Sequence, residues 1–353
     1  MSRRAVVLCP GRASYGKAQL GSLSALDATP SASELAQAVA AVDTRREAAG
    51  DLTVRGMDGA EKFRSAFLEG HNAAPLIFAV TAFEALRLDP ELVDVVAVGG
   101  NSMGWYSALW AAGALDLEGA FELIGTMGAM TRDGVVGGQS IYPVVDDDWR
   151  PSPDRAVQVD RALRQVVEDG HAAGDSIRFG GLRVLWGDDA AIAALAEALP
   201  TVKLGKTEYP LRLLGNSAFH SQLMSNASTS GRQALAGLPL EAPRVPLIDG
   251  TGRQWRPLTT STDSLLSYTL GHQVTETFDF AATVRVALRE YAPDVIVALG
   301  PGESLGGAVA QVLIAEGWQG IHNRDDFLER QADDPIVISL ARPDQASLVA
   351  RVG

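Results

Sequence analysis

The sequence contains a single cysteine, Cys9, among its 353 residues. An internal disulfide is therefore excluded, and so is a zinc site built from several cysteines. This composition fits a reducing compartment. The glycine-rich segments lack the lysine of a phosphate-binding loop and the glycine spacing of a dinucleotide-binding fold. We therefore expect no metal ion, nucleotide or flavin as a cofactor.

Long apolar runs are also missing. The first four residues include two arginines, and the apolar stretch that follows covers only residues 5–9 before Pro10 and Gly11 end it. A signal peptide needs a longer apolar core, and a membrane-spanning helix needs about 20 apolar residues. We therefore expect a cytoplasmic protein with no membrane partner.

Positive charge is scarce, since 30 lysines and arginines stand against 43 acidic residues and give a net charge of −13. Such a chain is repelled by phosphate backbones, so we expect no nucleic-acid partner. The chain does contain 46% hydrophobic and 21% charged residues, which is ordinary for a folded globular protein. Its length favours about two domains.

Apolar runs that end in glycine or proline predict buried strands, and longer apolar stretches predict helices. The predicted strands are 5–9, 93–98, 295–299 and 336–340, and the predicted helices are 76–88, 102–112 and 117–130. Pro75 suits the first position of the helix that it precedes. This alternation of strands and helices indicates a parallel α/β domain.

A different order of elements occupies the middle of the chain. We expect strands at 140–145, 177–179, 182–186 and 202–204, and helices at 160–168 and 190–199. The order β-α-β-β-α-β is typical of a ferredoxin-like module. We therefore predict a ferredoxin-like α+β subdomain at 137–212, inserted into a parallel-sheet domain formed by 1–136 and 213–353.

The strongest local signal is a G-x-S-x-G sequence at residues 100–104, between a predicted strand and a predicted helix. A nucleophile elbow requires this context, because the serine must sit on a tight strand-to-helix turn. The free N–H groups at the start of the helix favour negative charge developing near Ser102. The alternative interpretation is a glycine-rich turn with a capping serine.

A serine nucleophile needs a base, and the sequence has five histidines. His220 follows the inserted module, at the point where the chain re-enters the main domain. A cleft between domains is a common place for a substrate site. His220 is therefore the candidate base, and a capping or surface histidine is the alternative interpretation.

Six segments in order carry a family pattern. They read P-G-R-A-S at 10–14, G-N-S-M-G at 100–104, F-H with a methionine at 219–224, A-P-R-V-P at 242–246, glutamine with two phenylalanines at 273–280, and G-P-G with a leucine at 300–305. With these segments the chain resembles the malonyl-CoA:acyl carrier protein transacylase family, which includes the acyltransferase domains of polyketide synthases. The resemblance implies an α/β-hydrolase-like domain with a ferredoxin-like one, and a place in fatty-acid or polyketide biosynthesis.

The resemblance also implies a ping-pong acyl transfer through an acyl-serine. Ser102 would be the nucleophile, His220 the general base, and the backbone carbonyl at Gln273 the group that orients the imidazole. The backbone N–H groups of Arg12 and Met103 would form the oxyanion hole. The donor would be acyl-CoA, and the acceptor would be the phosphopantetheine thiol that an acyl carrier protein supplies as the partner.

One departure from the family bears on the substrate. The malonyl enzymes of the family carry an arginine, which pairs with the free carboxylate of malonate, at the position of Met127. A thioether cannot pair with a carboxylate, so Met127 favours an uncharged acyl group such as acetyl or propionyl. We expect Met127 and Phe219 to line the acyl pocket. Arg12, where the family has glutamine, is a candidate for the missing cation.

Three other interpretations stay open. A thioester hydrolase that clears acyl groups from carrier proteins would use the same Ser102 and His220. A non-catalytic partner of a synthase would need neither side chain. An unrelated α/β-hydrolase esterase would need an acidic residue between the serine and the histidine in chain order.

Overall fold

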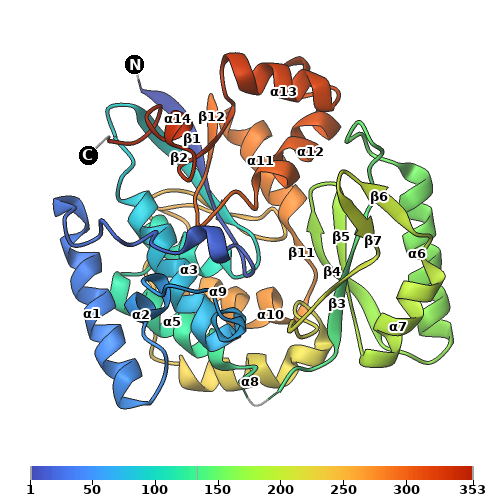
Figure 1. Ribbon diagram of the computed structural model, residues 1–353, viewed down its shortest axis with the longest axis horizontal. Coiled ribbons are helices and arrows are strands. Elements are labelled where there is room, and N and C mark those ends of the chain that lie inside the picture. The colour runs from blue at the N-terminus through green and yellow to red at the C-terminus, as the bar shows by residue number, and fades with distance from the viewer. Residues whose placement is uncertain (1, 133, 352–353) are drawn as a thin grey trace.

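Short apolar segments from distant parts of the sequence lie side by side in one largely parallel sheet (Figure 1). The computed structural model describes residues 2–132 and 134–351. The strand order is β10-β9-β2-β1-β12-β13, with β10 antiparallel to β9. The carboxyl ends of β1 and β2 share one edge, so the loops that follow these strands meet there. The strands are β1 (Arg3–Cys9), β2 (Val93–Gly100), β9 (Leu247–Ile248), β10 (Gln254–Trp255), β12 (Val295–Ala298) and β13 (Val337–Ser339).

Helices cover both faces of this sheet. Successive strand residues point to opposite faces. A Cβ on Gly99 would lie 2.7 Å from Thr283 of α11 (Phe280–Tyr291), whereas one on Gly100 would lie 2.2 Å from Gly104 of α4 (Gly104–Ala111). Further helices of this lobe are α1 (Ser33–Ala48), α2 (Val54–Asp58), α3 (Gly70–Ala85), α5 (Leu117–Ala129), α8 (Ser225–Ala234), α9 (Thr262–Ser267), α10 (Gln273–Thr275), α12 (Gly306–Glu316), α13 (Arg324–Asp333) and α14 (Pro343–Ala346).

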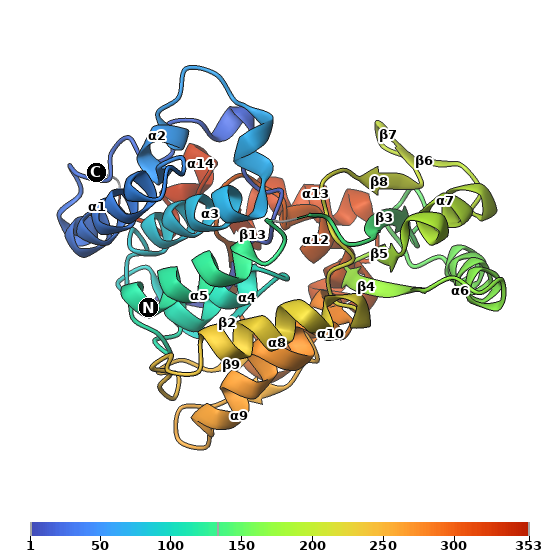
Figure 2. The ribbon, with the colours of Figure 1, turned by 90° about the horizontal axis from the view of Figure 1, so that it is seen from below.

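A second sheet has the order β11-β4-β5-β3-β8 and its own hydrophobic core. Helices α6 and α7 pack on one of its faces, at the far end of the molecule from α1 (Figure 2). Its four antiparallel strands and two helices form the expected ferredoxin-like unit, so the predicted fold class is confirmed. The elements are β3 (Gly138–Pro143), α6 (Pro153–Glu168), β4 (Ala173–Phe179), β5 (Leu182–Gly187), α7 (Asp189–Ala198), β8 (Leu211–Leu213) and β11 (Phe278–Asp279).

The fourth strand of this unit differs from the prediction. Residues 202–204 form β6 (Val202–Leu204), which pairs with β7 (Thr207–Tyr209) in a separate hairpin closed by Gly205 at φ +61°. The strand that pairs with β3 is β8, seven residues beyond the end of β6. The glycine turn reverses the chain before β6 can reach the sheet edge. The predicted boundaries at 137 and 212 stay a prediction.

Pro75 also departs from the prediction, because α3 begins at Gly70 and the proline lies inside it. A proline in a helix leaves the carbonyl four residues earlier without its N–H partner. Here that carbonyl belongs to His71, and it accepts a hydrogen bond of 2.8 Å from Arg46 Nη1 of α1. A side chain from a neighbouring helix therefore satisfies the group that the proline leaves open.

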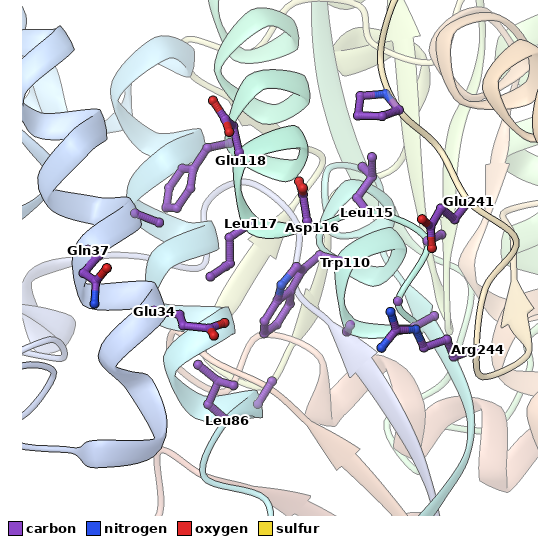
Figure 3. A pocket seen from close by; sticks show the side chains of 18 of the residues that line it. Glu34, Gln37, Leu86, Trp110, Leu115, Asp116, Leu117, Glu118, Glu241 and Arg244 are labelled. Atoms are coloured by element: carbon purple, nitrogen blue, oxygen red, sulfur yellow. The ribbon is translucent and has the colours of Figure 1, made fainter.

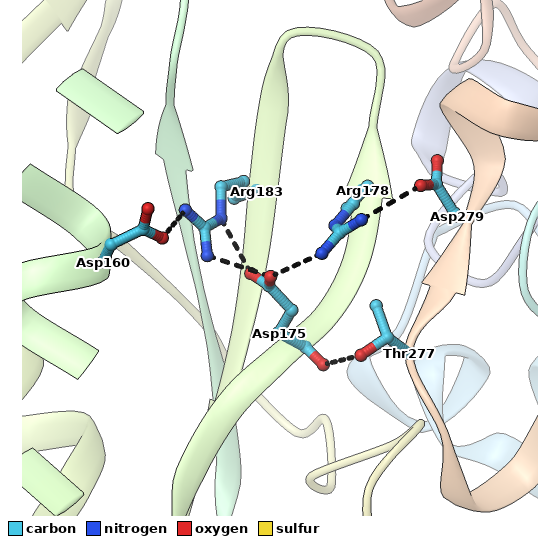
Figure 4. A network of polar contacts seen from close by, with 6 residues as sticks. All are labelled: Asp160, Asp175, Arg178, Arg183, Thr277 and Asp279. Atoms are coloured by element: carbon cyan, nitrogen blue, oxygen red, sulfur yellow. Dashed lines mark hydrogen bonds and ion pairs between the residues drawn. The ribbon is translucent and has the colours of Figure 1, made fainter. Parts of the chain in front are cut away.

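A polar network joins the second sheet to the rest of the chain (Figure 4). Arg183 Nε and Asp175 Oδ1 lie 2.7 Å apart, and the same guanidinium lies 2.6 Å from Asp160 of α6. Arg178 reaches Asp279 of β11 at 3.4 Å. Helix α11 starts directly after β11 and packs on the first sheet. The contact of Arg178 with Asp279 therefore links the two lobes.

Among the described residues, no helix is both long and apolar enough to cross a membrane.

Candidate active site

The turn between β2 and α4 has no room for side chains at its two glycines. A Cβ on Gly100 would lie 2.2 Å from the carbonyl oxygen of Gly104, and one on Gly104 would lie 2.2 Å from the carbonyl oxygen of Cys9. Between them Ser102 has φ +55°, a left-handed conformation that a non-glycine residue rarely adopts. The geometry is that of a nucleophile elbow rather than of an ordinary capping turn.

The loop after β1 packs directly on this elbow. The N–H of Asn101 donates to the carbonyl of Cys9 at 3.0 Å, and a Cβ on Gly11 would lie 2.8 Å from the carbonyl oxygen of Asn101. Arg12 and Met103 both line the cavity beside Ser102. Within residues 2–132 and 134–351, their backbone N–H groups donate no hydrogen bond. The two residues predicted to form the oxyanion hole therefore line the cavity and have free backbone donors.

His220 lies between the serine and a backbone carbonyl. Its Nε2 is 2.7 Å from Ser102 Oγ, and its Nδ1 is 2.6 Å from the carbonyl oxygen of Gln273. A carbonyl only accepts, so Nδ1 carries the proton. Nε2 is then unprotonated and accepts the hydrogen bond of the serine hydroxyl. The structure thus brings together three residues that are 118 and 53 positions apart.

The imidazole is held in its neutral form. Only 4% of His220 is exposed. Burial lowers the pKa of His220 to about 4, although the hydrogen bond to the Gln273 carbonyl acts in the opposite direction. The base is therefore free to accept a proton at neutral pH. Its backbone also lies in the left-handed region, at φ +57°.

Gln273 contributes more than the sequence predicted. Its side-chain Oε1 accepts from the Tyr106 hydroxyl at 2.9 Å, and its Nε2 donates to the carbonyl of Ser102 at 3.1 Å. A π-helical turn, Tyr268–His272, directly precedes it. Such turns recur at functional sites. Gln273 therefore contacts His220 through its backbone carbonyl and the turn at Ser102 through its side-chain amide.

The cavity beside Ser102 has a volume of about 60 Å³, which is close to the space of two water molecules. Met127 and Phe219 line it, as expected, together with Met130, Met224 and Val274. The wall is therefore mostly apolar, and the space suits a short acyl group.

A larger groove of about 1000 Å³ lies elsewhere, between α1, the end of α4 and the start of α5 (Figure 3). Its lining includes Glu34, Trp110 and Arg244, and none of the predicted site residues. Ser102, His220 and the two residues with free backbone N–H groups line the smaller cavity instead. No cluster of three or more His, Cys, Asp or Glu in the described parts of the chain could hold a metal ion.

Comparison with known proteins agrees with this geometry. The sequence is 23% identical over 247 residues to the malonyl CoA-acyl carrier protein transacylase of Bacillus subtilis, covering 69% of this chain and 72% of that protein. A malonyl-CoA:acyl carrier protein transacylase from Xanthomonas oryzae superimposes with a TM-score of 0.71, at 19% identity and 99% coverage of both chains. The chain shares the fold of these transacylases.

Other solved structures give the same result. An acyl carrier protein S-malonyltransferase from Vibrio cholerae matches with a TM-score of 0.69 and 19% identity, covering 88% of this chain and 94% of that one. A malonyl-transacylase in complex with a type II PKS acyl-carrier protein matches with a TM-score of 0.70 and 20% identity over 98% of both chains. The sequence resemblance to the transacylase family is thus confirmed, although no family model matches the sequence.

Proposed function

We propose that this protein is an acyltransferase that moves a short acyl group from acyl-CoA to an acyl carrier protein through an acyl-Ser102 intermediate. The observation that carries the proposal is the relay from Ser102 Oγ through the His220 imidazole to the Gln273 carbonyl, with distances of 2.7 and 2.6 Å. This relay activates a hydroxyl without an acidic residue.

In the first half-reaction, Ser102 Oγ attacks the thioester carbonyl carbon while its proton passes to His220 Nε2. The negative charge that develops on the carbonyl oxygen is stabilised by the backbone N–H groups of Arg12 and Met103. The tetrahedral intermediate collapses with cleavage of the carbon–sulfur bond. The departing CoA sulfur takes the proton from Nε2, which leaves a neutral imidazole and an acyl-serine ester.

The second half-reaction runs the same chemistry in reverse. His220 takes the proton from a phosphopantetheine thiol, and the sulfur attacks the ester carbonyl. The carbon–oxygen bond to Ser102 breaks, and Nε2 returns its proton to Oγ. The acyl group leaves as a thioester on the carrier protein, and the enzyme is regenerated.

Two observations support a carrier protein as the acceptor. A relative of the same fold was solved with a type II PKS acyl-carrier protein. The chain itself exposes Lys203 and Lys206 on the β6–β7 hairpin and Arg212 on β8, where Arg212 lies 3.2 Å from Asp189. Carrier proteins are typically acidic, so this basic group would favour their approach although the chain is negatively charged overall.

Intact-mass spectrometry with a panel of acyl-CoA thioesters tests the proposal. The wild-type chain should gain the mass of the acyl group, and Ser102→Ala should not. Adding a carrier protein that bears phosphopantetheine should move this mass to the carrier. Loss of the acyl group to water at the same rate without a carrier would identify a hydrolase instead. Absence of any adduct with every thioester would overturn the proposal.

A further inference from the structure

The side chain of Arg12 points from the oxyanion loop into the acyl cavity. Its guanidinium carbon lies 5.1 Å from the centre of the Phe219 ring, and its Nη2 lies 3.3 Å from the carbonyl oxygen of Leu68. Both Arg12 and Phe219 line the cavity that contains Ser102. The backbone N–H and the guanidinium of one residue therefore face the same small space.

This guanidinium lies beside the helix turn that carries Met127. A Cβ on Gly70 would lie 3.6 Å from Arg12 Nη1 and 2.5 Å from the carbonyl oxygen of Gly128. The carbonyl end of α5, whose last residue is Ala129, therefore lies near Arg12, and the dipole of a helix favours a cation at this end. Arg12 and Met127 thus line the same cavity, and its positive charge does not come from α5.

The guanidinium has donors to spare. It carries five N–H donors, and the contact with Leu68 uses one of them. None of the ion pairs between described residues includes Arg12, and the neighbouring carboxylate of Glu69 faces His71 at 3.7 Å. Burial lowers the pKa of Arg12 without neutralising it. A half-buried cation that has no counter-ion among the described residues is costly unless a ligand supplies the negative charge.

We propose that Arg12 binds the free carboxylate of a dicarboxylic acyl group of the malonyl class, while its own N–H holds the thioester oxygen. The inference rests on the proposed function. A carboxylate two bonds from the thioester carbonyl could accept two parallel N–H donors from the guanidinium. The guanidinium carbon lies over the Phe219 ring, a contact that uses none of the N–H donors.

The test compares malonyl-CoA with acetyl-CoA as acyl donors, by initial rates of Ser102 acylation, in the wild type, Arg12→Met and Arg12→Lys. Every variant keeps the backbone N–H at position 12. The ratio of kcat/KM for malonyl-CoA to that for acetyl-CoA should fall about 10- to 100-fold in Arg12→Met. The fall should be smaller in Arg12→Lys, which keeps the charge but not the planar fork.

Two further variants make the result specific. Arg64 stacks on Phe67 at 5.0 Å and does not line the cavity, so Arg64→Met is a matched control that should leave the ratio unchanged. The double variant Arg12→Met/Met127→Arg, which places a guanidinium on α5 instead, should recover the preference for malonyl-CoA.

The outcomes separate this inference from the proposed function. Acylation of the wild type by acetyl-CoA with no preference for malonyl-CoA would overturn the role of Arg12 and leave the acyltransferase intact. An equal fall in kcat/KM for malonyl-CoA and acetyl-CoA in Arg12→Met would mean that Arg12 has only a structural role. No acylation by either donor would overturn the proposed function itself.

Discussion

Two polar networks of this protein have opposite characters, one between the lobes and one inside the larger lobe. The network around Asp175 and Arg183 is ionic, and these two side chains are 11% and 13% exposed. The relay from Ser102 through His220 to Gln273 is neutral, and its last two residues are buried. The first network holds charges in fixed pairs, whereas the second leaves a hydroxyl and an imidazole poised to exchange a proton.

The difference shows how stability and reactivity are separated in one fold. Asp175 uses both carboxylate oxygens on Arg183, and its backbone carbonyl accepts from Thr277, so nothing remains for a ligand. In the relay, by contrast, the nucleophile and the two N–H groups at Arg12 and Met103 have capacity left over. We expect substitutions in the first network to change stability and substitutions in the second to change the rate.

The largest effect is expected for His220→Asn. Asparagine tolerates the positive φ of this position but cannot take the serine proton. The kcat/KM of acylation should fall about 10⁴-fold, because the general base is lost. Stopped-flow or quenched mass measurements of the acyl-enzyme would show this. A loss of less than tenfold would mean that another group activates Ser102.

A pH effect on stability comes next. The unfolded chain binds a proton at its histidines below about pH 6.5, whereas folded His220 does so only near pH 4. The free energy of unfolding should therefore fall as the pH drops from 6.5 to 4, by up to about 3 kcal/mol from this residue. Denaturant titrations of the wild type and His220→Asn should converge at low pH. If the two variants showed the same dependence on pH, the pKa of His220 would be the same in the folded and the unfolded chain.

Asp175→Asn should lower stability and leave the rate nearly unchanged, whereas His220→Asn mainly lowers the rate. The substitution leaves Arg183 with Asp160 as its remaining carboxylate and should lower the free energy of unfolding by about 1–3 kcal/mol. The kcat should change little, since no atom of the relay is touched. Denaturation and acylation assays on the same variant check both halves. A large fall in kcat without loss of stability would mean that the ionic network positions the base.

The smallest effect concerns the elbow itself. Because Ser102 has φ +55°, Ser102→Gly should be about 1 kcal/mol more stable than Ser102→Ala, although neither can form an acyl-enzyme. Thermal unfolding of the two variants would measure the difference. Equal stability would show that the elbow is not strained.

Much of the site could be predicted from the sequence, because its chemistry lies in short segments. The glycines around Ser102 marked the elbow, and the residues around His220 and Gln273 carried the family pattern. The fourth strand of the small sheet was missed because β6 and β8 are equally short and partly exposed, so no burial pattern separates them. The start of α3 was missed because the partner of the His71 carbonyl comes from another helix.

The environment of Arg12 could not be predicted from the sequence either, because its contacts come from distant segments. Its distance from Phe219 and the absence of an ion pair among the described residues depend on three segments that meet only in the folded chain. The sequence shows the residue type at each position, whereas the contacts of its side chain depend on the packing.

The π-helical turn Tyr268–His272 has a consequence for how such a site can arise. A π turn is an α-helical turn widened by one residue. Removing that residue would rotate Gln273 by about 100° about the helix axis, which would take its carbonyl away from His220 and its amide away from the elbow. A deletion of one residue in this turn would therefore separate Gln273 from both of its partners at once.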